Sequence, residues 1–252
     1  MQPKKIILLA SDCESTRWVY HALEEALQIE AVILEQPISK KELAKNRIKK
    51  IGLMRVIGQV LFSTLVVPFL KMKSKNRKAS LISKYRLNTN CFSNAQTWRV
   101  SSVNEVECLN AIGLLKPDII VVNGTRIISK KILQSTNAVF INMHVGITPQ
   151  YRGSHGGYWA LYNNDVENFG TTIHLIDAGI DTGAVLKQVF IKPDKPDNFA
   201  TYPVLQAAVG IGALKEVLLN IVSDNYKIIK HTEKGKMYFQ PTLWQYLTGG
   251  VR

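Results

Sequence analysis

The chain has 252 residues, 46% of them hydrophobic, which is enough for one large domain, or one domain with a modest appendage, around a sizeable core. Its net charge of +13 is uneven, because residues 39–86 hold 14 of the 32 basic residues and only one of the 19 acidic residues. Three widely spaced cysteines argue against a disulfide framework, and the apolar run at 6–10 is too short for a signal-peptide core. We therefore expect a cytoplasmic protein whose excess positive charge belongs to one segment.

The first part of the chain predicts a parallel α/β sheet. Residues 6–10 form a short apolar run typical of a buried parallel strand. Residues 14–28 have apolar positions at helical spacing, and residues 31–34 indicate a second strand. Strand, helix and strand with short connections indicate a Rossmann-like, mostly parallel sheet flanked by helices.

The basic segment 39–86 is predicted to be a helical insertion with an apolar centre. Residues 56–70 are about fifteen mostly apolar residues, short of the ~20 that span a bilayer and interrupted by Gln59 and Pro68. Three interpretations remain open: a helix docked on the domain with solvated basic flanks, a helix at an anionic membrane surface, and a subunit interface.

The second half continues the α/β pattern as far as residue 200. We expect a helix at 104–115, strands at 119–122 and 139–143, and a short helix at 129–133. Ligand sites in such sheets lie beyond the carboxyl ends of the strands, where Gly124 and His144 fall. Residues 201–252 are expected to form a small C-terminal extension packed on the same domain, with a helix at 201–219 and a hairpin from 226–229 and 235–238.

The polar residues around position 142 suggest acyl-transfer chemistry. Asn142 and His144 are two positions apart near the end of a strand, so their side chains share one face. Asp177 and Asp181 follow in a glycine-punctuated loop. An amide, an imidazole and a carboxylate are the groups needed to hold a tetrahedral oxyanion and to move its protons.

The order of these residues resembles the folate-dependent formyltransferases. The resemblance covers residues 95–190 and is carried by Asn142-x-His144, then Pro149-x-Tyr151-Arg152-Gly153, then Asp181-x-Gly183. It implies the formyltransferase fold, with catalysis in residues 1–200, and N10-formyltetrahydrofolate as formyl donor.

The resemblance also implies roles for individual residues. Asn142 would hold the oxyanion, and His144 would either donate to it as an imidazolium or accept the proton of the attacking amine. Asp181 would set the charge of His144. The pterin ring of the folate would lie against Gly124, Arg126, Ile127 and Ile128, with Asp177 and Gly179 shaping the loop beside it. The amine substrate would face Tyr151, Arg152, Gly153 and His155. We read His174 as a core histidine, and we expect no metal.

Departures from the family pattern narrow the expected substrate. Gly146 stands where a serine is usual, and residues 11–15 contain no glycine-rich phosphate turn, which makes glycinamide ribonucleotide doubtful. Only about sixty residues follow the site, too few for a tRNA-binding barrel. We therefore expect a primary amine on a small molecule, a nucleotide-linked amino sugar for surface polysaccharide synthesis.

Two other functions remain open. One is hydrolysis of formyltetrahydrofolate, with water in place of the amine. The other is a non-catalytic basic module that docks to membrane or nucleic acid through residues 39–86. Nucleic acid is the less expected partner. A homodimer and a peripheral contact with the inner membrane surface are both compatible with this composition.

Overall fold

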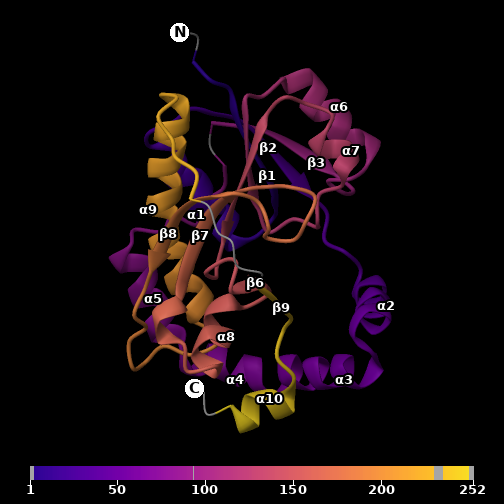
Figure 1. Cartoon of the computed structure of the whole chain (residues 1–252), viewed down its shortest axis with the longest axis vertical. Coiled ribbons are helices and arrows are strands. Elements are labelled where there is room, and N and C mark those ends of the chain that lie inside the picture. Colours follow the sequence, from indigo (N-terminus) through magenta and orange to yellow (C-terminus); the bar gives the residue numbers. More distant parts are fainter. Residues whose placement is uncertain (1–2, 93, 230–234, 250–252) are drawn as a thin grey trace.

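A seven-stranded sheet forms the centre of the protein (Figure 1), and it is mostly parallel, as the sequence predicts. The computed structural model describes residues 3–92, 94–229 and 235–249. The strand order is β3-β2-β1-β4-β5-β7-β8. The first five strands are parallel, and β7 is antiparallel to both of its neighbours, β5 and β8. The strands are β1 (Ile6–Ser11), β2 (Ile29–Glu35), β3 (Gln96–Val100), β4 (Ile119–Asn123), β5 (Val139–His144), β7 (Gly170–Leu175) and β8 (Val185–Phe190).

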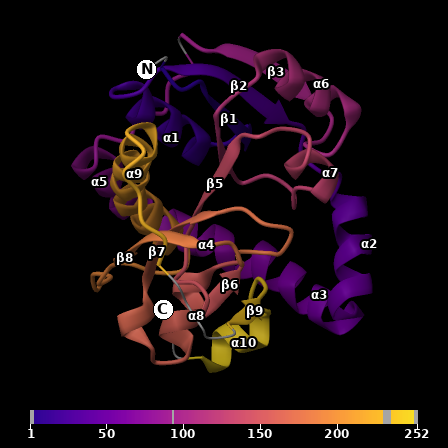
Figure 2. The ribbon, with the colours of Figure 1, turned by 45° about the horizontal axis from the view of Figure 1, so that its top comes forward.

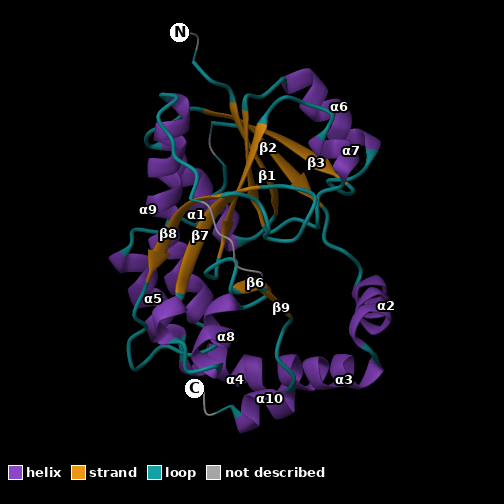
Figure 3. Cartoon of the chain, viewed as in Figure 1, coloured by secondary structure: helices purple, strands orange, loops and turns teal. Residues whose placement is uncertain are grey.

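Helices cover both faces of this sheet (Figure 3). Alternating residues of β1 show the division, because Ile6 and Leu8 pack into one core whereas Ile7 and Leu9 pack into the other. The first core also contains α1 (Glu14–Glu24) and α9 (Tyr202–Val222). The second contains α6 (Val106–Leu115) and α7 (Lys130–Leu133). Burial on both faces explains why the parallel strands read as continuous apolar runs.

The segment between β2 and β3 is helical, and we call it the helical arm (residues 40–84). Figure 2 shows its first two helices at one side of the molecule. Gly52 has φ 85°, a conformation that glycine adopts readily, and it separates the first two helices of the arm. The Arg77 guanidinium holds the arm to the body through two hydrogen bonds of 2.9 and 2.7 Å to the Asp197 carboxylate. The arm consists of α2 (Lys40–Ile51), α3 (Leu53–Leu61), a π-helical turn η1 (Phe62–Val66), α4 (Val67–Lys73) and α5 (Lys75–Lys84).

Two helices in the described part of the chain are long and apolar enough to cross a membrane, judged by length and composition alone. The first is the continuous helix of residues 53–73, and the second is α9. In the most apolar stretch of α9, 61% is buried inside the protein, whereas in the most apolar stretch of residues 53–73 only 28% is buried. The buried helix α9 is therefore a core helix of the domain, whereas the helix in the arm has an apolar surface without a partner in the described chain.

The predicted C-terminal hairpin is wrong. Ile229 instead forms an antiparallel bridge with Val185, and residues 230–234 lie outside the described chain. Strand β9 (Lys236–Tyr238) pairs in parallel with β6 (Tyr151–Gly153). The sequence indicates that residues 226–229 and 236–238 form strands, but it does not reveal that they pair with β8 and β6 and not with each other. The remaining elements are α8 (Gly156–Tyr162), the 3₁₀ turn η2 (Val166–Asn168) and α10 (Leu243–Thr248).

Candidate active site

A cavity of about 660 Å³ opens at the carboxyl ends of the parallel strands. It lies where the strand order reverses between β1 and β4, the usual position of a ligand site in an open α/β sheet. The residues after β1, β4 and β5 line it, together with the loop between β7 and β8. The catalytic candidates Asn142, His144 and Asp181 all line this one cavity.

These three side chains form a connected polar cluster. The Nδ1 atom of His144 lies 3.5 Å from Oδ2 of Asp181. The amide Nδ2 of Asn142 lies 3.1 Å from Nε2 of His174. Nε2 of His174 also lies 3.7 Å from Oδ1 of Asp181. Asn142 and His174 are opposite each other across the antiparallel β5 and β7 pair, which brings them together.

The surroundings of His144 assign different tasks to its two ring nitrogens. Nε2 lies 2.8 Å from the carbonyl oxygen of Tyr151, to which it donates. Nδ1 is thereby left to face Asp181. Burial lowers the pKa of His144 below its usual 6.5, although the charge of Asp181 opposes this change. The neutral ring is a proton acceptor at Nδ1.

Asp181 is held as a carboxylate. Burial by itself would raise its pKa, but hydrogen bonding to His174, the charge of His144 and the Gly153 N–H outweigh burial and lower the pKa to about 2. The Gly153 N–H donates to Oδ2 over 2.8 Å. Asp181 also has φ 50°, a left-handed conformation that aspartate tolerates better than most residues. The loop thus fixes a negative charge beside the His144 ring.

The interpretation of His174 as a core histidine is incomplete. The residue is buried, as expected, but it also lines the cavity and contacts both Asn142 and Asp181. Its Nδ1 donates to the carbonyl oxygen of Leu175 over 2.7 Å, so that Nε2 accepts from Asn142. His174 is the fifth residue of β7, and it reaches the site because β7 pairs with β5. That pairing is not visible in the sequence.

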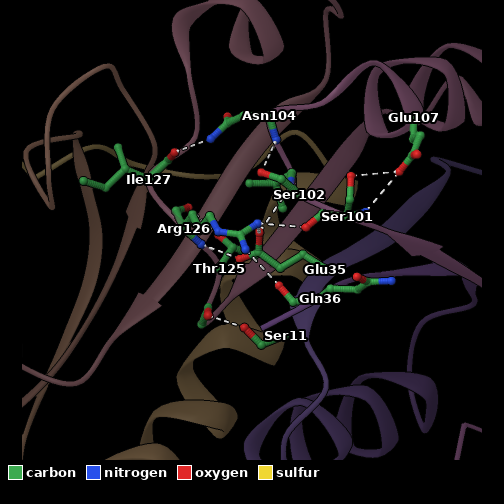
Figure 4. A network of polar contacts seen from close by, with 12 residues as sticks. Ser11, Glu35, Gln36, Ser101, Ser102, Asn104, Glu107, Thr125, Arg126 and Ile127 are labelled. Atoms are coloured by element: carbon green, nitrogen blue, oxygen red, sulfur yellow. Dashed lines mark hydrogen bonds and ion pairs between the residues drawn. The ribbon is translucent and has the colours of Figure 1, made fainter. Parts of the chain in front are cut away.

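The predicted folate-binding turn lines the cavity through Gly124, Arg126, Ile127 and Ile128. Figure 4 shows that the Arg126 guanidinium is engaged elsewhere: it contacts the buried Glu35 carboxylate at 3.1 Å and the carbonyl oxygen of Ser101 at 3.0 Å. The Arg126 backbone N–H also donates to Glu35, over 2.5 Å. Arg126 therefore ties the turn to the ends of β2 and β3, and the isoleucines supply the apolar surface.

The loop before Asp181 is shaped by Asp177, whose Oδ1 accepts from the Gly179 N–H at 2.9 Å and from the Thr182 hydroxyl at 2.6 Å. A Cβ atom on Gly179 would lie 1.9 Å from Thr182 Oγ1, so this turn requires glycine. Asp177 and Gly179 both line the cavity.

Four residues are expected to face the amine substrate. Gly153 lines the cavity, whereas Tyr151, Arg152 and His155 do not. The Tyr151 hydroxyl donates to Asp165 over 2.8 Å, and burial raises its pKa to about 12. Arg152 donates to the carbonyl oxygen of Gly235 over 2.9 Å. The His155 ring packs against Phe199, and burial, followed by the charge of Arg47, lowers its pKa to about 4. Pairing of β6 with β9 turns this loop into the body of the protein.

Sequence reasoning missed a second wall of the cavity. Cys13, Glu14, Ser15 and Trp18, from the start of α1, line it, as do Pro203, Val204 and Ala207 of α9. The position of residues 13–18 directly after the first strand is the signal that could have identified the α1 part. Nothing in the local pattern marks the residues of α9.

The structure explains why position 146 is a glycine. A Cβ atom there would lie 2.6 Å from Nε2 of His144 and 2.7 Å from the carbonyl oxygen of Tyr151, the two atoms of one hydrogen bond. Glycine therefore permits the contact that fixes the His144 tautomer. Among residues 3–92, 94–229 and 235–249, no group of three or more His, Cys, Asp or Glu side chains is arranged to hold a metal ion.

Comparison with known proteins agrees with this geometry. The formyl transferase family matches residues 63–202, which is more than half of the chain and includes every catalytic candidate. Methionyl-tRNA formyltransferase of Trichormus variabilis is 33% identical over 135 residues, which cover 53% of this chain and 40% of that protein. The Myxococcus xanthus methionyl-tRNA formyltransferase is 34% identical over 122 residues, covering 47% and 38%. The chain thus matches about two fifths of the length of these curated relatives.

Solved structures share the fold at low identity. A sugar N-formyltransferase from Shewanella aligns with a TM-score of 0.56 and 19% identity, covering 93% of this chain and 76% of that one. Phosphoribosylglycinamide formyltransferase of Streptococcus pneumoniae aligns with a TM-score of 0.55 and 17% identity, covering 86% and 98%. By its sequence match, its sheet and its cluster of Asn142, His144 and Asp181, the chain belongs to the formyltransferase family.

Proposed function

We propose that this protein transfers the formyl group of N10-formyltetrahydrofolate to a primary amine, and that the acceptor is an amino sugar carried on a nucleotide. The observation that carries the proposal is the meeting of Asn142, His144 and Asp181 at one cavity. Family membership supports the reaction class. The acceptor is inferred from the wall of the cavity around α1.

The cavity suits a folate. Ile127, Ile128, Ile176 and Ile180 give it an apolar lining that can enclose a ring, and polar side chains meet at one place within it. Residues 124–128 would hold the pterin, and Asp177 would keep the opposite loop in shape. When bound, the folate supplies an activated formyl carbon.

Each polar side chain then has a defined task. Asn142 donates one amide N–H to His174. Its second N–H is therefore available to the oxygen that gains negative charge as the amine attacks. His144 accepts the proton of the amine at Nδ1, and the nearby Asp181 carboxylate stabilises the imidazolium that results. The proton then passes, directly or through water, to the folate nitrogen that leaves. The lowered pKa of His144 favours this role over that of a permanent imidazolium.

The wall at α1 suits a hydroxylated acceptor. Trp18 offers an apolar ring, and Glu14 and Ser15 offer polar atoms that can bond sugar hydroxyls. Lys78 lies beside Glu14, with Nζ 2.5 Å from Oε2, and brings a positive charge to this end of the cavity. A lysine there can contact the phosphates of a linked nucleotide.

The test is a panel of amines incubated with the protein and N10-formyltetrahydrofolate, with formylated products identified by mass spectrometry. The panel contains nucleotide-linked amino sugars, the same sugars without the nucleotide, glycinamide ribonucleotide and methionyl-tRNA. We expect a formylated nucleotide-linked sugar as the main product. Formate released at the same rate with and without amines would identify a hydrolase, and formylated methionyl-tRNA as main product would refute the proposed acceptor.

A further inference from the structure

The helical arm carries an apolar stripe that no described part of the chain covers. Six large side chains between residues 54 and 72 are 41% to 70% exposed, and they recur every three to five residues along one side of the helix. Figure 1 shows α3 and α4 at the end of the molecule opposite α6. The six residues, which we call the apolar stripe, are Met54, Ile57, Val60, Leu65, Phe69 and Met72.

The opposite side of the same helix is bound to the body of the protein. Phe62 is fully buried and packs against Phe199 and Tyr246. Gln59 donates to the carbonyl oxygen of Gln240 over 2.7 Å. Because one side of the helix is packed against the body of the protein along its length, the apolar stripe on the other side faces outward along the whole helix. Such a helix can lie in the plane of a membrane surface, but it cannot cross the bilayer surrounded by lipid.

The charges around the stripe indicate what covers it. Basic residues flank both ends, with five lysines on the exposed helix α2, Arg55 within α3, and Lys71, Lys73 and Lys75 near the end of α4. In the described part of the chain, Arg77 and Lys78 are the basic residues of the arm that form ion pairs with carboxylates. Glu42 is the single acid of the segment. A second copy docked on this stripe would bring two such basic surfaces together, whereas an anionic surface complements them.

We propose that the apolar stripe and its basic flanks dock the protein on an anionic phospholipid bilayer. The stripe enters the boundary between headgroups and acyl chains while the lysines contact the lipid phosphates. The docking site lies on the arm and is separate from the folate cavity, whose lining contains no residue of the arm. It therefore holds whether or not the proposed reaction is correct.

The experiment is cosedimentation with vesicles of phosphatidylcholine, with and without phosphatidylglycerol, at low and high salt. We expect binding that requires phosphatidylglycerol and weakens with salt. The variant Leu65→Glu/Phe69→Glu should bind at least about tenfold more weakly, because it removes two inserted apolar side chains. Its matched control is Leu114→Glu, which changes a leucine of similar exposure on α6 and should bind like the wild type.

A second pair of variants separates charge from insertion. Lys71→Glu/Lys73→Glu should also bind about tenfold more weakly, whereas Lys130→Glu/Lys131→Glu on α7 should not. Thermal unfolding checks that each variant folds. Equal binding of neutral and anionic vesicles, or unchanged binding by both arm variants, would overturn the proposal. So would a wild-type dimer in light scattering that Leu65→Glu/Phe69→Glu converts to a monomer, with no vesicle binding by either.

Discussion

Two opposing effects act on the pKa of His144. Burial lowers its pKa, and the Asp181 carboxylate at 3.5 Å raises it. The outcome is a ring that is neutral near pH 7 but that has a negative charge ready beside the nitrogen that takes a proton. This arrangement is suited to a general base, because the imidazolium that forms during the reaction is stabilised more than the neutral ring.

The pH dependence of turnover tests this assignment. In the wild type, kcat should rise with pH through the pKa of His144, below 6.5, and then stay level. Asp181→Asn removes the charge that raises this pKa, so the rising limb should move to lower pH. The level rate should fall by about 10²–10⁴-fold, since the imidazolium loses its partner. The asparagine oxygen can still accept from the Gly153 N–H, which preserves the loop.

The measurement is a kcat profile at saturating amine and folate. His21→Ala is the control, because this half-buried histidine contacts the carbonyl oxygen of Asn90 and does not line the cavity. Its profile should match the wild type. If kcat of the wild type instead fell as pH rose through the His144 pKa, the ring would act as a protonated donor, and its role as a base would be excluded.

At this scale the sequence predicts what one strand determines. Asn142 and His144 share a face of β5 because their spacing alone fixes it. His174 reaches them only through the pairing of β7 with β5, a contact across about thirty residues that no local pattern specifies. The position of Tyr151 and His155 outside the cavity is equally invisible in the local sequence, since it depends on the pairing of β6 with β9, more than eighty residues away.

At the scale of single elements, α3 and α10 meet through one glycine. A Cβ atom on Gly58 would lie 2.4 Å from Cζ2 of Trp244 and 2.8 Å from Cβ of Thr242. We expect Gly58→Ala to destabilise the fold by about 1–2 kcal/mol, because overpacking costs more than the helix propensity gained. Gly113 in α6 has no heavy atom within 4 Å of such a Cβ. Gly113→Ala should therefore stabilise by about 0.5–1 kcal/mol.

Denaturant unfolding measures both variants. The double variant Gly58→Ala/Trp244→Ala separates crowding from propensity, since truncation of Trp244 removes the clash. In the Trp244→Ala background, the alanine at 58 should become neutral or stabilising. A Gly58→Ala protein as stable as Gly113→Ala would show that α10 does not pack tightly on α3.

The elements with strong local signals were predictable, and those that depend on distant partners were not. Strands β1 and β4 are continuous apolar runs because both of their faces are buried. Strand β3 lies at the sheet edge with mostly exposed or half-buried residues, so it lacks that signal. The helical nature of the arm was predictable, but its turn at Gly52 and its contacts with Gln240 and Asp197 depend on residues far along the chain.

At the scale of the whole molecule, most of the excess positive charge lies outside the folate cavity, and Lys78 brings a charge only to the end of the cavity at Glu14. The basic excess lies in the arm, whereas the cavity is lined by Glu14, Asp177 and Asp181 together with Arg126. Arg126 is already bonded to Glu35, so it contributes little free positive charge. Folate binding should accordingly depend on the apolar lining more than on the net charge of the protein, and should be less sensitive to salt than vesicle binding.

Folate binding by the folded protein can be tested by the rise in melting temperature that 5-formyltetrahydrofolate, an unreactive analogue, produces. A ligand that binds only the folded state, present at a hundred times its Kd, stabilises the protein by about 2.7 kcal/mol and raises Tm by about 5–10 °C for a chain of this size.

His144→Ala should keep this shift, because it removes a proton acceptor and leaves the apolar walls. Ile127→Gln should reduce it, since Ile127 lines the cavity with 57% of its surface exposed. Val106→Gln changes a residue of the same 57% exposure outside the cavity and should bind normally. Equal shifts for the Ile127 and Val106 variants would place the folate elsewhere, and no shift in the wild type would refute folate binding by this cavity.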